Sequence, residues 1–258
     1  MTDADNPQNP DTGILPKRPK RPETIASHIR DLIVEQGLQP GDRLPASWLQ
    51  GDELTASRGT MREAMKILQI QGLITSKTGP GGGAFISALT HEQAIQLLDN
   101  LFLFFQPSIA DIYALRKLLE PELAADVSGR LSDQGHNDLQ QTIRLYQDEP
   151  RTAQEEYEQR MAELEFHSVL ARHCSNALLG FVCTFLISLL RDTTECRAIY
   201  ADPHPELREA GLGYQVSLLR AIKAGNHDRA RQIMSDHMLK AEQYMLERAA
   251  IRARSRAD

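Results

Sequence analysis

The segment SRGTMREAMKILQIQGLI, Ser57 to Ile74, decides how the first third of the chain folds. Side chains four residues apart lie above one another on a helix, so Arg58, Arg62 and Lys66 form one basic stripe. A second stripe is apolar and must pack against a core; it consists of Met61, Ala64, Met65 and Leu68. The segment therefore predicts an amphipathic helix. Taken alone, its basic stripe fits a solvated face as well as a phosphate-rich partner.

The flanking segments complete a small fold around this helix. Residues 24–36 have helical periodicity, and Gly37 follows where a left-handed residue ends a helix. A short helix is expected at 46–54, and Ser57 can cap the third helix through its hydroxyl. After Gly72, LITSK and AFIS are two short strands joined by the glycine-rich TGPGGG. Three helices and a hairpin predict a winged helix-turn-helix, which places its third helix in the major groove of DNA.

Length, charge and composition allow two domains of an ordinary globular protein. The chain has 258 residues, of which 41% are hydrophobic and 25% charged. Residues 12–90 carry a net charge of +3 and residues 91–258 carry −6, which suits a chain that places only its front on a polyanion.

The absence of targeting signals and the number of cysteines indicate where in the cell the protein is expected. No apolar run is long enough to span a membrane, and residues 1–21 lack a signal-peptide core. The three cysteines fall in helical segments and predict reduced thiols. We therefore expect a cytoplasmic protein without a membrane partner, preceded by a disordered tail at 1–21.

Residues 91–258 have helical periodicity almost throughout, and the short polar breaks between segments predict an antiparallel bundle. Polar side chains interrupt the apolar stripes of several of these helices, namely Arg116, Glu163, His167, Gln215 and His237. Unpaired polar groups are costly in a core, so we expect them to pair with one another, with a metal ion or with a ligand. Because they belong to different helices, they predict a polar pocket inside the bundle.

The front of the chain resembles a known family. PGDRLP, an eleven-residue spacer, SRGTMREAMKILQIQGLI and GPGGGAFI are similar to the DNA-binding domain of GntR-family bacterial transcriptional regulators. The resemblance implies DNA contacts by Arg43, Ser57, Arg58, Gly59, Thr60, Arg62, Lys66, Gly81 and Gly82. Of the two helix arginines, one would bind a guanine edge while the other and Lys66 hold phosphates. Trp48 departs from the family pattern, which often has a DNA-contacting arginine at this position.

The rear of the chain resembles the all-helical FCD effector domain of the FadR subfamily. The similar segments are DIYALRKLLEPELAADVS, AELEFHSVLARHCSN and LLRAIKAGNHDRARQIMSDHM. Many relatives bind a divalent metal (Zn, Ni or Mn), and the resemblance places its ligands at Glu163, His167 and His237. The fourth position holds Gln215, whose amide is a poor substitute for imidazole on zinc or nickel. Some relatives bind no metal, so an empty polar pocket and paired core histidines stay open as alternatives.

Effectors of this family are usually small organic acids. The resemblance makes Arg116 the candidate carboxylate anchor, because a guanidinium group offers a bidentate fork to a carboxylate. Glu163, His167, Gln215 and His237 would complete the effector site. A salt bridge between Arg116 and Glu120 or another neighbour is the alternative.

The sequence thus predicts a mainly α protein in which two folded domains and a C-terminal tail follow residue 21. Residues 22–89 form the winged helix-turn-helix of three helices and a β-hairpin wing, 90–248 form an antiparallel all-α bundle for effector binding and dimerisation, and 249–258 form a tail. We expect a homodimeric transcriptional regulator on an inverted-repeat operator of double-stranded DNA, and not an enzyme. Two alternatives stay open: a structural DNA-binding protein without an effector, and a metal-dependent enzyme built on the bundle.

Overall fold

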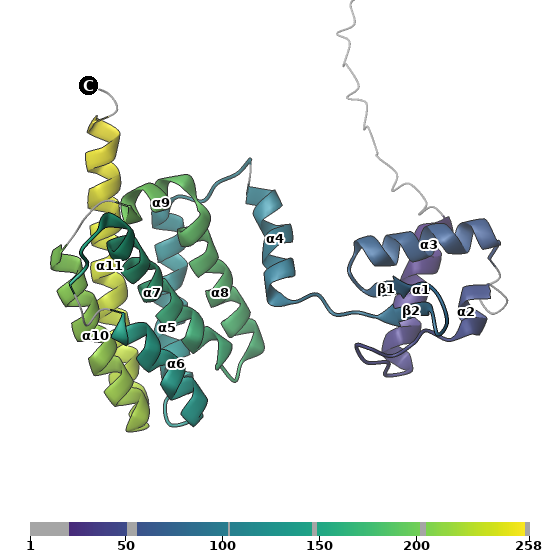
Figure 1. Cartoon of the computed structure of the whole chain (residues 1–258), viewed down its shortest axis with the longest axis horizontal. Helices are drawn as coiled ribbons and strands as arrows, with labels where there is room; N and C mark the ends of the chain where they lie inside the picture. Colours follow the sequence, from purple (N-terminus) through teal and green to yellow (C-terminus); the bar gives the residue numbers. More distant parts are fainter. Residues whose placement is uncertain (1–20, 51–55, 103, 146–148, 202–204, 256–258) are drawn as a thin grey trace, which may run out of the picture. The chain divides into compact units, whose positions relative to one another are not determined.

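The computed structural model describes residues 21–50, 56–102, 104–145, 149–201 and 205–255. The chain divides into two compact units, Met1–Thr90 and His91–Asp258 (Figure 1). The tail expected at 1–21 lies outside the described residues except for Arg21, and so does the end of the helix expected at 46–54.

The first unit packs three helices against a two-stranded hairpin (Figure 1). The elements are α1 (Arg21–Glu35), α2 (Ala46–Gln50), α3 (Arg58–Ile70), β1 (Ile74–Lys77) and β2 (Gly83–Ile86). The strands are antiparallel, with Ile74 opposite Ile86. Apolar side chains from all five elements share one core, including Ile29, Trp48 and Leu68. This arrangement confirms the predicted winged helix-turn-helix.

The second unit is a helical bundle without a strand in its described part. Its helices are α4 (His91–Phe102), α5 (Ile109–Val127), α6 (Asp133–Arg144), α7 (Ala153–Arg172), α8 (Ala177–Asp192), α9 (Thr194–Tyr200), α10 (Pro205–Lys223) and α11 (His227–Ser255). Helix α11 continues beyond residue 248, where a tail was expected, because the added segment is rich in Ala and Arg, which favour helices. The mainly α fold class is confirmed.

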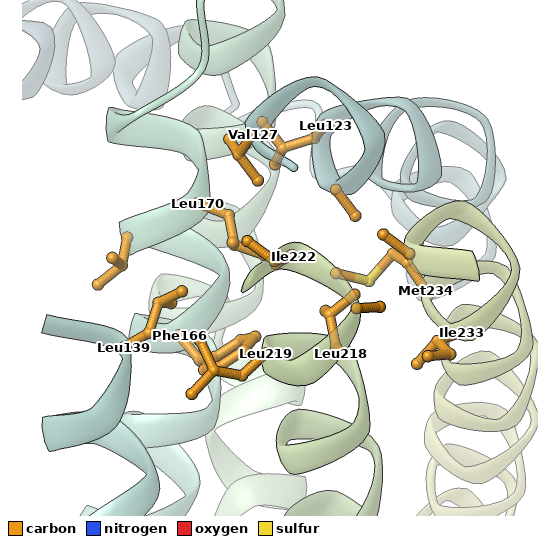
Figure 2. Packing of buried hydrophobic residues seen from close by; sticks show 14 of the residues in the cluster. Leu123, Val127, Leu139, Phe166, Leu170, Leu218, Leu219, Ile222, Ile233 and Met234 are labelled. Atoms are coloured by element: carbon orange, nitrogen blue, oxygen red, sulfur yellow. The ribbon is translucent and has the colours of Figure 1, made fainter. Parts of the chain in front are cut away.

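Buried apolar side chains from α5, α6, α7, α8, α10 and α11 meet in the main core of this bundle (Figure 2). Leu123 and Val127 extend from α5, Phe166 and Leu170 from α7, and Ile222 from α10. Helix α11 closes the core with further buried residues, Ile233, Met234 and Met238. Polar residues on the core-facing sides of α5, α7, α10 and α11 are therefore held among tightly packed neighbours.

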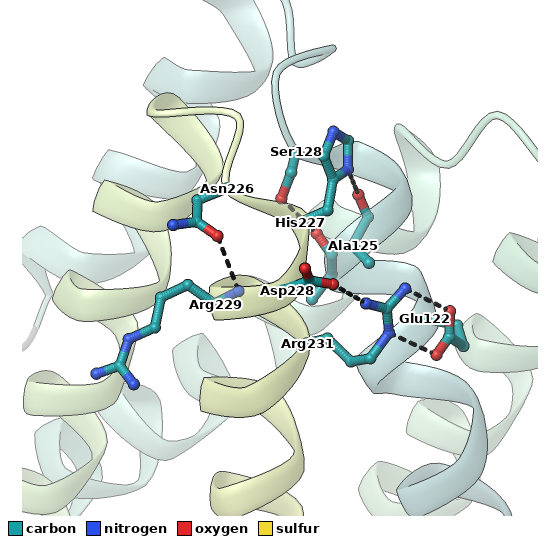
Figure 3. A network of polar contacts seen from close by, with 9 residues as sticks. Glu122, Ala125, Ser128, Asn226, His227, Asp228, Arg229 and Arg231 are labelled. Atoms are coloured by element: carbon teal, nitrogen blue, oxygen red, sulfur yellow. Dashed lines mark hydrogen bonds and ion pairs between the residues drawn. The ribbon is translucent and has the colours of Figure 1, made fainter.

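Polar contacts hold the start of α11 against α5 (Figure 3). Arg231 binds both carboxylate oxygens of Glu122, from Nε at 2.7 Å and from Nη2 at 3.1 Å, and binds Asp228 from Nη1 at 2.8 Å. His227 Nδ1 lies 2.8 Å from the carbonyl oxygen of Ala125. These contacts join the start of α11 to α5 near the surface, beside the buried packing between the two helices.

The apolar run FVCTFLISLL belongs to α8, whose Ile187 and Leu190 are buried in the bundle. In the described part of the chain, no single helix is long and apolar enough to cross a bilayer. Helices α8 and α9 reach that length and composition only together, and a bend of 73° separates them.

Candidate functional site

Helix α3 exposes the basic stripe that the sequence predicts. Arg58 and Arg62 are exposed on one side, while Met61, Ala64 and Leu68 are buried on the other. Within the described part of the chain, neither arginine forms an ion pair or side-chain hydrogen bond. Their guanidinium groups therefore keep all their donors for an external partner.

The amino end of α3 has features that favour anion binding. Ser57 caps the helix, because its Oγ accepts a hydrogen bond from the backbone N–H of Thr60 at 3.1 Å. The Ser57 and Thr60 hydroxyl oxygens lie 2.8 Å apart. Unpaired N–H groups and the helix dipole give this end a partial positive charge, which favours a phosphate group.

Lys66, at the other end of the stripe, has an intramolecular partner. Its Nζ lies 3.0 Å from Oε1 of Glu63, and both side chains are more than half exposed. Exposed ion pairs contribute little to stability, so Lys66 can exchange Glu63 for a phosphate at small cost.

Arg43 and the wing glycines lie together in the first unit. Arg43 Nη2 donates to the carbonyl oxygen of Gly82 at 2.5 Å. Gly83 has a φ of +151°, and a Cβ there would lie 2.7 Å from Arg43 Nε. Gly81, at the exposed tip of the wing, has a φ of +77°. The guanidinium group of Arg43 thus lies across the hairpin, and glycine provides the space for it.

Trp48 is a core residue in this protein. Its side chain is 2% exposed and packs in the cluster formed by α1, α3 and the hairpin. A buried indole contributes a large apolar surface to such a small domain. The family position that often holds a DNA-contacting arginine therefore faces the protein interior here.

In the second unit, four polar side chains form a continuous polar relay, which consists of the buried Arg116, Glu120 and His167 and the half-buried Tyr214. Arg116 and Glu120 form an ion pair one turn apart on α5, and both are almost completely buried. The other Glu120 oxygen contacts His167 Nδ1 on α7. His167 Nε2 lies 2.9 Å from the Tyr214 hydroxyl on α10. Arg116 thus makes the salt bridge that the sequence left open as an alternative.

The charges of the Arg116–Glu120 pair stabilise each other. Burial raises the pKa of Glu120, but Arg116 and His167 outweigh burial and lower this pKa to about 2. Burial lowers the pKa of Arg116, and Glu120 more than compensates, so the pKa lies above its ordinary value. Both groups are ionised at neutral pH, and each satisfies the other.

A cavity of about 360 Å³ beside the relay is lined mainly by α7, α10 and α11, with Tyr113 of α5 and Tyr200 of α9 completing its wall. Of the predicted effector residues, Glu163 and His237 line it, whereas Arg116, His167 and Gln215 do not. Glu163 Oε1 lies 3.6 Å from His237 Nε2, and the Tyr214 ring stacks on the His237 ring with centroids 3.4 Å apart. The relay therefore reaches the cavity wall through Tyr214.

Burial shifts the pKa values of Glu163 and His237 in the directions that favour their neutral forms. Desolvation raises the pKa of Glu163, although His167, Arg116 and Arg160 oppose this shift. The pKa of His237 lies well below its ordinary value because of burial, with His167 and Arg116 adding to the effect. Burial thus favours the neutral form of each group.

Gln215 is completely buried on α10, and neither of its amide atoms has a hydrogen-bond partner among the described residues.

The predicted metal ligands Glu163, His167 and His237 do not fit a metal ion, because Glu120 and Tyr214 engage both ring nitrogens of His167. No group of three His, Cys, Asp or Glu side chains in the described ranges is placed to hold a metal.

Arg160 lines the cavity but was not among the predicted site residues. It lies three residues before Glu163 on α7, so the two side chains share one face of the helix. Extending the polar stripe of Glu163 and His167 by one turn toward the amino end identifies Arg160 from the sequence.

The first unit is a winged helix-turn-helix whose third helix exposes a basic stripe, and the second unit is a helical bundle with an internal cavity. Together they define the class of DNA-binding regulators that carry a ligand-binding domain in the same chain. The chain matches the bacterial regulatory proteins of the gntR family over residues 22–86 and the FCD domain over residues 111–240. It therefore belongs to the GntR-family transcriptional regulators that carry an FCD domain.

Similar proteins support this assignment. The HTH-type transcriptional regulator LutR of Bacillus subtilis is 25% identical over 213 residues, which cover 82% of this chain and 94% of LutR. The Uxu operon transcriptional regulator of Escherichia coli is 24% identical over 234 residues, covering 87% of this chain and 86% of that protein. The domains and relatives are those of transcriptional regulators and not of enzymes.

A solved structure shares the fold. Streptococcus agalactiae GntR aligns with a TM-score of 0.62 and 21% sequence identity, covering 86% of this chain and 99% of that one. At this level of identity the likeness concerns the fold alone, and it agrees with a helix-turn-helix unit followed by a helical unit.

Proposed function

We propose that this transcriptional regulator acts in the cytoplasm as a homodimer on an inverted-repeat operator, and that a small organic acid bound in the α7–α10–α11 cavity controls its affinity for DNA. One observation carries the DNA-binding part of the proposal. Helix α3 is fixed in the core by one face, while Arg58 and Arg62 on the other face have no partner within the described residues.

The proposed DNA contacts divide by chemistry. Arg58 and Arg62 read base edges or bind phosphates in the major groove. Ser57, Thr60 and Gly59 form the amino end of α3, where a backbone without a side chain at Gly59 can approach a phosphate closely. Lys66, Arg43 and the wing residues Gly81 and Gly82 contribute backbone contacts at the edges of the site.

The proposed dimer follows from exposed apolar surface and from symmetry. The second unit exposes large apolar side chains on α4, α5 and α11, including Leu97, Leu101, Leu118, Leu239 and Leu246. Exposed apolar residues in such numbers are typical of interaction surfaces. A two-fold dimer presents two copies of α3, so its operator must be an inverted repeat.

The effector part rests on the cavity. Glu163 and His237 face its interior, and we propose that they contact the acid directly. Arg116, His167 and Gln215 are buried behind them. The contacts that run from Arg116 through Glu120 and His167 hold Tyr214, which stacks on His237. The effector changes DNA affinity only if it binds the DNA-bound and free states unequally.

Selection of bound duplexes from a random pool by the full-length protein tests the DNA-binding part. We expect an enriched palindrome whose half-sites lie about one helical turn apart. Recovery of unrelated sequences with equal, weak affinity would favour the alternative of a structural DNA-binding protein.

The selected operator then tests the effector part. Its affinity for the full-length protein is measured by fluorescence anisotropy with and without saturating carboxylic acids. We expect at least one acid to shift this affinity by about 5- to 150-fold. An affinity that stays constant for every acid shown to bind rules out control by an acid.

A further inference from the structure

In the described part of the second unit, Arg116 and Arg160 are both buried, but their surroundings differ. Arg116 lies behind the cavity wall, with its charge balanced by Glu120. Arg160 is 7% exposed and lines the cavity itself. The two residues therefore differ in whether a molecule inside the cavity can reach the guanidinium group.

Among the described residues, only two groups contact the Arg160 donors. Nη2 lies 3.3 Å from Oε1 of Glu156, and Nη1 lies 3.4 Å from the carbonyl oxygen of Ile199. Both distances exceed the usual range of about 2.7–3.2 Å for N–H···O hydrogen bonds. A guanidinium group has about five N–H donors, and a buried cation needs partners for them. Arg160 thus faces the cavity with donors to spare.

The rest of the cavity wall suits the body of a small acid. Tyr113, Tyr200 and Tyr244 line it together with Met245. Tyrosine rings provide apolar contact and a polar tip, while Glu163 and His237 provide hydrogen-bonding groups for a hydroxyl. A carboxylate at Arg160 therefore leaves the remainder of the molecule beside groups of mixed polarity.

We propose that Arg160, and not Arg116, binds the carboxylate of the ligand in this cavity. The inference rests on the proposed function and adds the residue that recognises the acid. The carboxylate takes the two terminal nitrogens of Arg160 in a bidentate pair and replaces the long contact with Glu156. Arg116 acts at a distance, because its pair with Glu120 holds His167 and Tyr214.

A pair of conservative substitutions in the full-length chain tests the assignment. Arg160→Lys and Arg116→Lys each keep the charge and remove the bidentate fork. Binding of sodium glycolate, L-lactate, succinate and gluconate is measured by calorimetry for each variant and for the unsubstituted chain. Arg160→Lys should raise the Kd of each acid that binds by about tenfold or more, whereas Arg116→Lys should change it by less than about threefold.

Three further variants distinguish a specific loss of acid binding from a general loss of folding. Arg160→Ala should raise the Kd by about 10- to 100-fold. Arg172→Ala, an exposed arginine of the same helix outside the cavity, should leave the Kd unchanged. Glu156→Gln removes the competing carboxylate and should leave binding equal or tighter. Circular dichroism of each free variant shows whether it folds; if Arg160→Ala does not, Arg160→Lys decides.

The possible results are distinct. If an acid binds the unsubstituted chain and both Arg160 variants equally, the Arg160 assignment is wrong while the proposed function stands. If Arg116→Lys weakens binding more than Arg160→Lys does, Arg116 is the anchor. If none of the four acids binds the unsubstituted chain, acid control is overturned, and the Arg160 assignment with it.

Discussion

Glu120 is the residue on which the buried polar groups of the second unit depend. It is completely buried and contacts both Arg116 and His167. Replacing it by Gln leaves the Arg116 charge in the core without its partner, which typically costs about 3–5 kcal/mol of stability. Urea unfolding at neutral pH measures this cost. Glu122→Gln, at an exposed carboxylate on the same helix, should cost less than about 1 kcal/mol. Equal costs for the two variants would contradict a dominant role for the buried pair.

The same carboxylate predicts a pH dependence. Its pKa is lowered from 4.5 to about 2 in the folded protein, because Arg116 and His167 outweigh burial. A depressed pKa means that the stabilisation is fully present above the unfolded pKa and is lost as the pH falls through the folded pKa. The stability difference between the unsubstituted chain and Glu120→Gln should therefore shrink between pH 4.5 and about 2. A difference that stays constant over this interval would show that Glu120 does not titrate as described.

Arg58 and Arg62 are the residues for which base reading is expected. Replacing a base-reading arginine by Ala should cost about 1–3 kcal/mol on the selected operator and relax specificity at the position it reads. Arg30→Ala is the matched control, because Arg30 is an exposed arginine of the same unit that binds Gln71 Oε1 at 2.6 Å. Competition titrations with single-base operator variants measure both effects. Loss of affinity without any change in base preference would assign the residue to phosphate binding.

Single residues were partly predictable. The periodicity of α5 and α7 placed Arg116 and His167 on buried faces, and both are buried. The Arg116–Glu120 pair lies within one helix, and the sequence offered it as an alternative. The contacts of His167 with Glu120 and Tyr214 depend instead on how three helices meet, which the pattern of one helix does not contain. Arg160 was missed because it precedes the segment that carries the family resemblance, although it shares a face with Glu163.

At the scale of elements, α3 depends on its cap. Ser57→Ala removes the side-chain acceptor for the Thr60 N–H and should destabilise the helix by about 0.5–2 kcal/mol. Ser57→Asp restores an acceptor but places a negative charge where DNA phosphates approach. We therefore expect Ser57→Asp to keep the stability of α3 and lose DNA affinity, whereas Ser57→Ala loses both. Amide hydrogen exchange in α3 and operator titration measure the two quantities separately. If both variants lose affinity equally while α3 exchanges at the same rate, the cap has no separate structural role.

Most elements were predictable because their signals are local. The helical periodicity expected after residue 90 is observed, for example in α7, and the two short strands around the glycine-rich turn are observed as β1 and β2. The short α9 was not predicted, because seven residues carry too little periodicity to be recognised. The interior position of Trp48 also depends on tertiary packing of three helices and the hairpin, which no local pattern specifies.

At the scale of the whole molecule, the proposed dimer has a measurable electrostatic signature. The logarithm of DNA affinity falls with the logarithm of salt concentration by about 0.9 for each phosphate contact. Lys66→Ala removes one such contact per chain, so a two-fold dimer should lose about two units of slope and a monomer about one. Lys223→Ala, at an exposed lysine that ends α10 in the second unit, should leave the slope unchanged. A slope change near one would indicate that a single copy of α3 contacts the operator.

The interior position of Trp48 gives the protein a built-in optical reporter. The chain has one tryptophan, which is buried in the first unit, and its six tyrosines all follow residue 112. Indole fluorescence of the unlabelled protein therefore originates in the helix-turn-helix unit alone. A ligand in the second unit that alters this emission has changed the environment of the other unit. Emission that stays constant, while tyrosine absorbance shows the ligand bound, would confine its effect to the bundle.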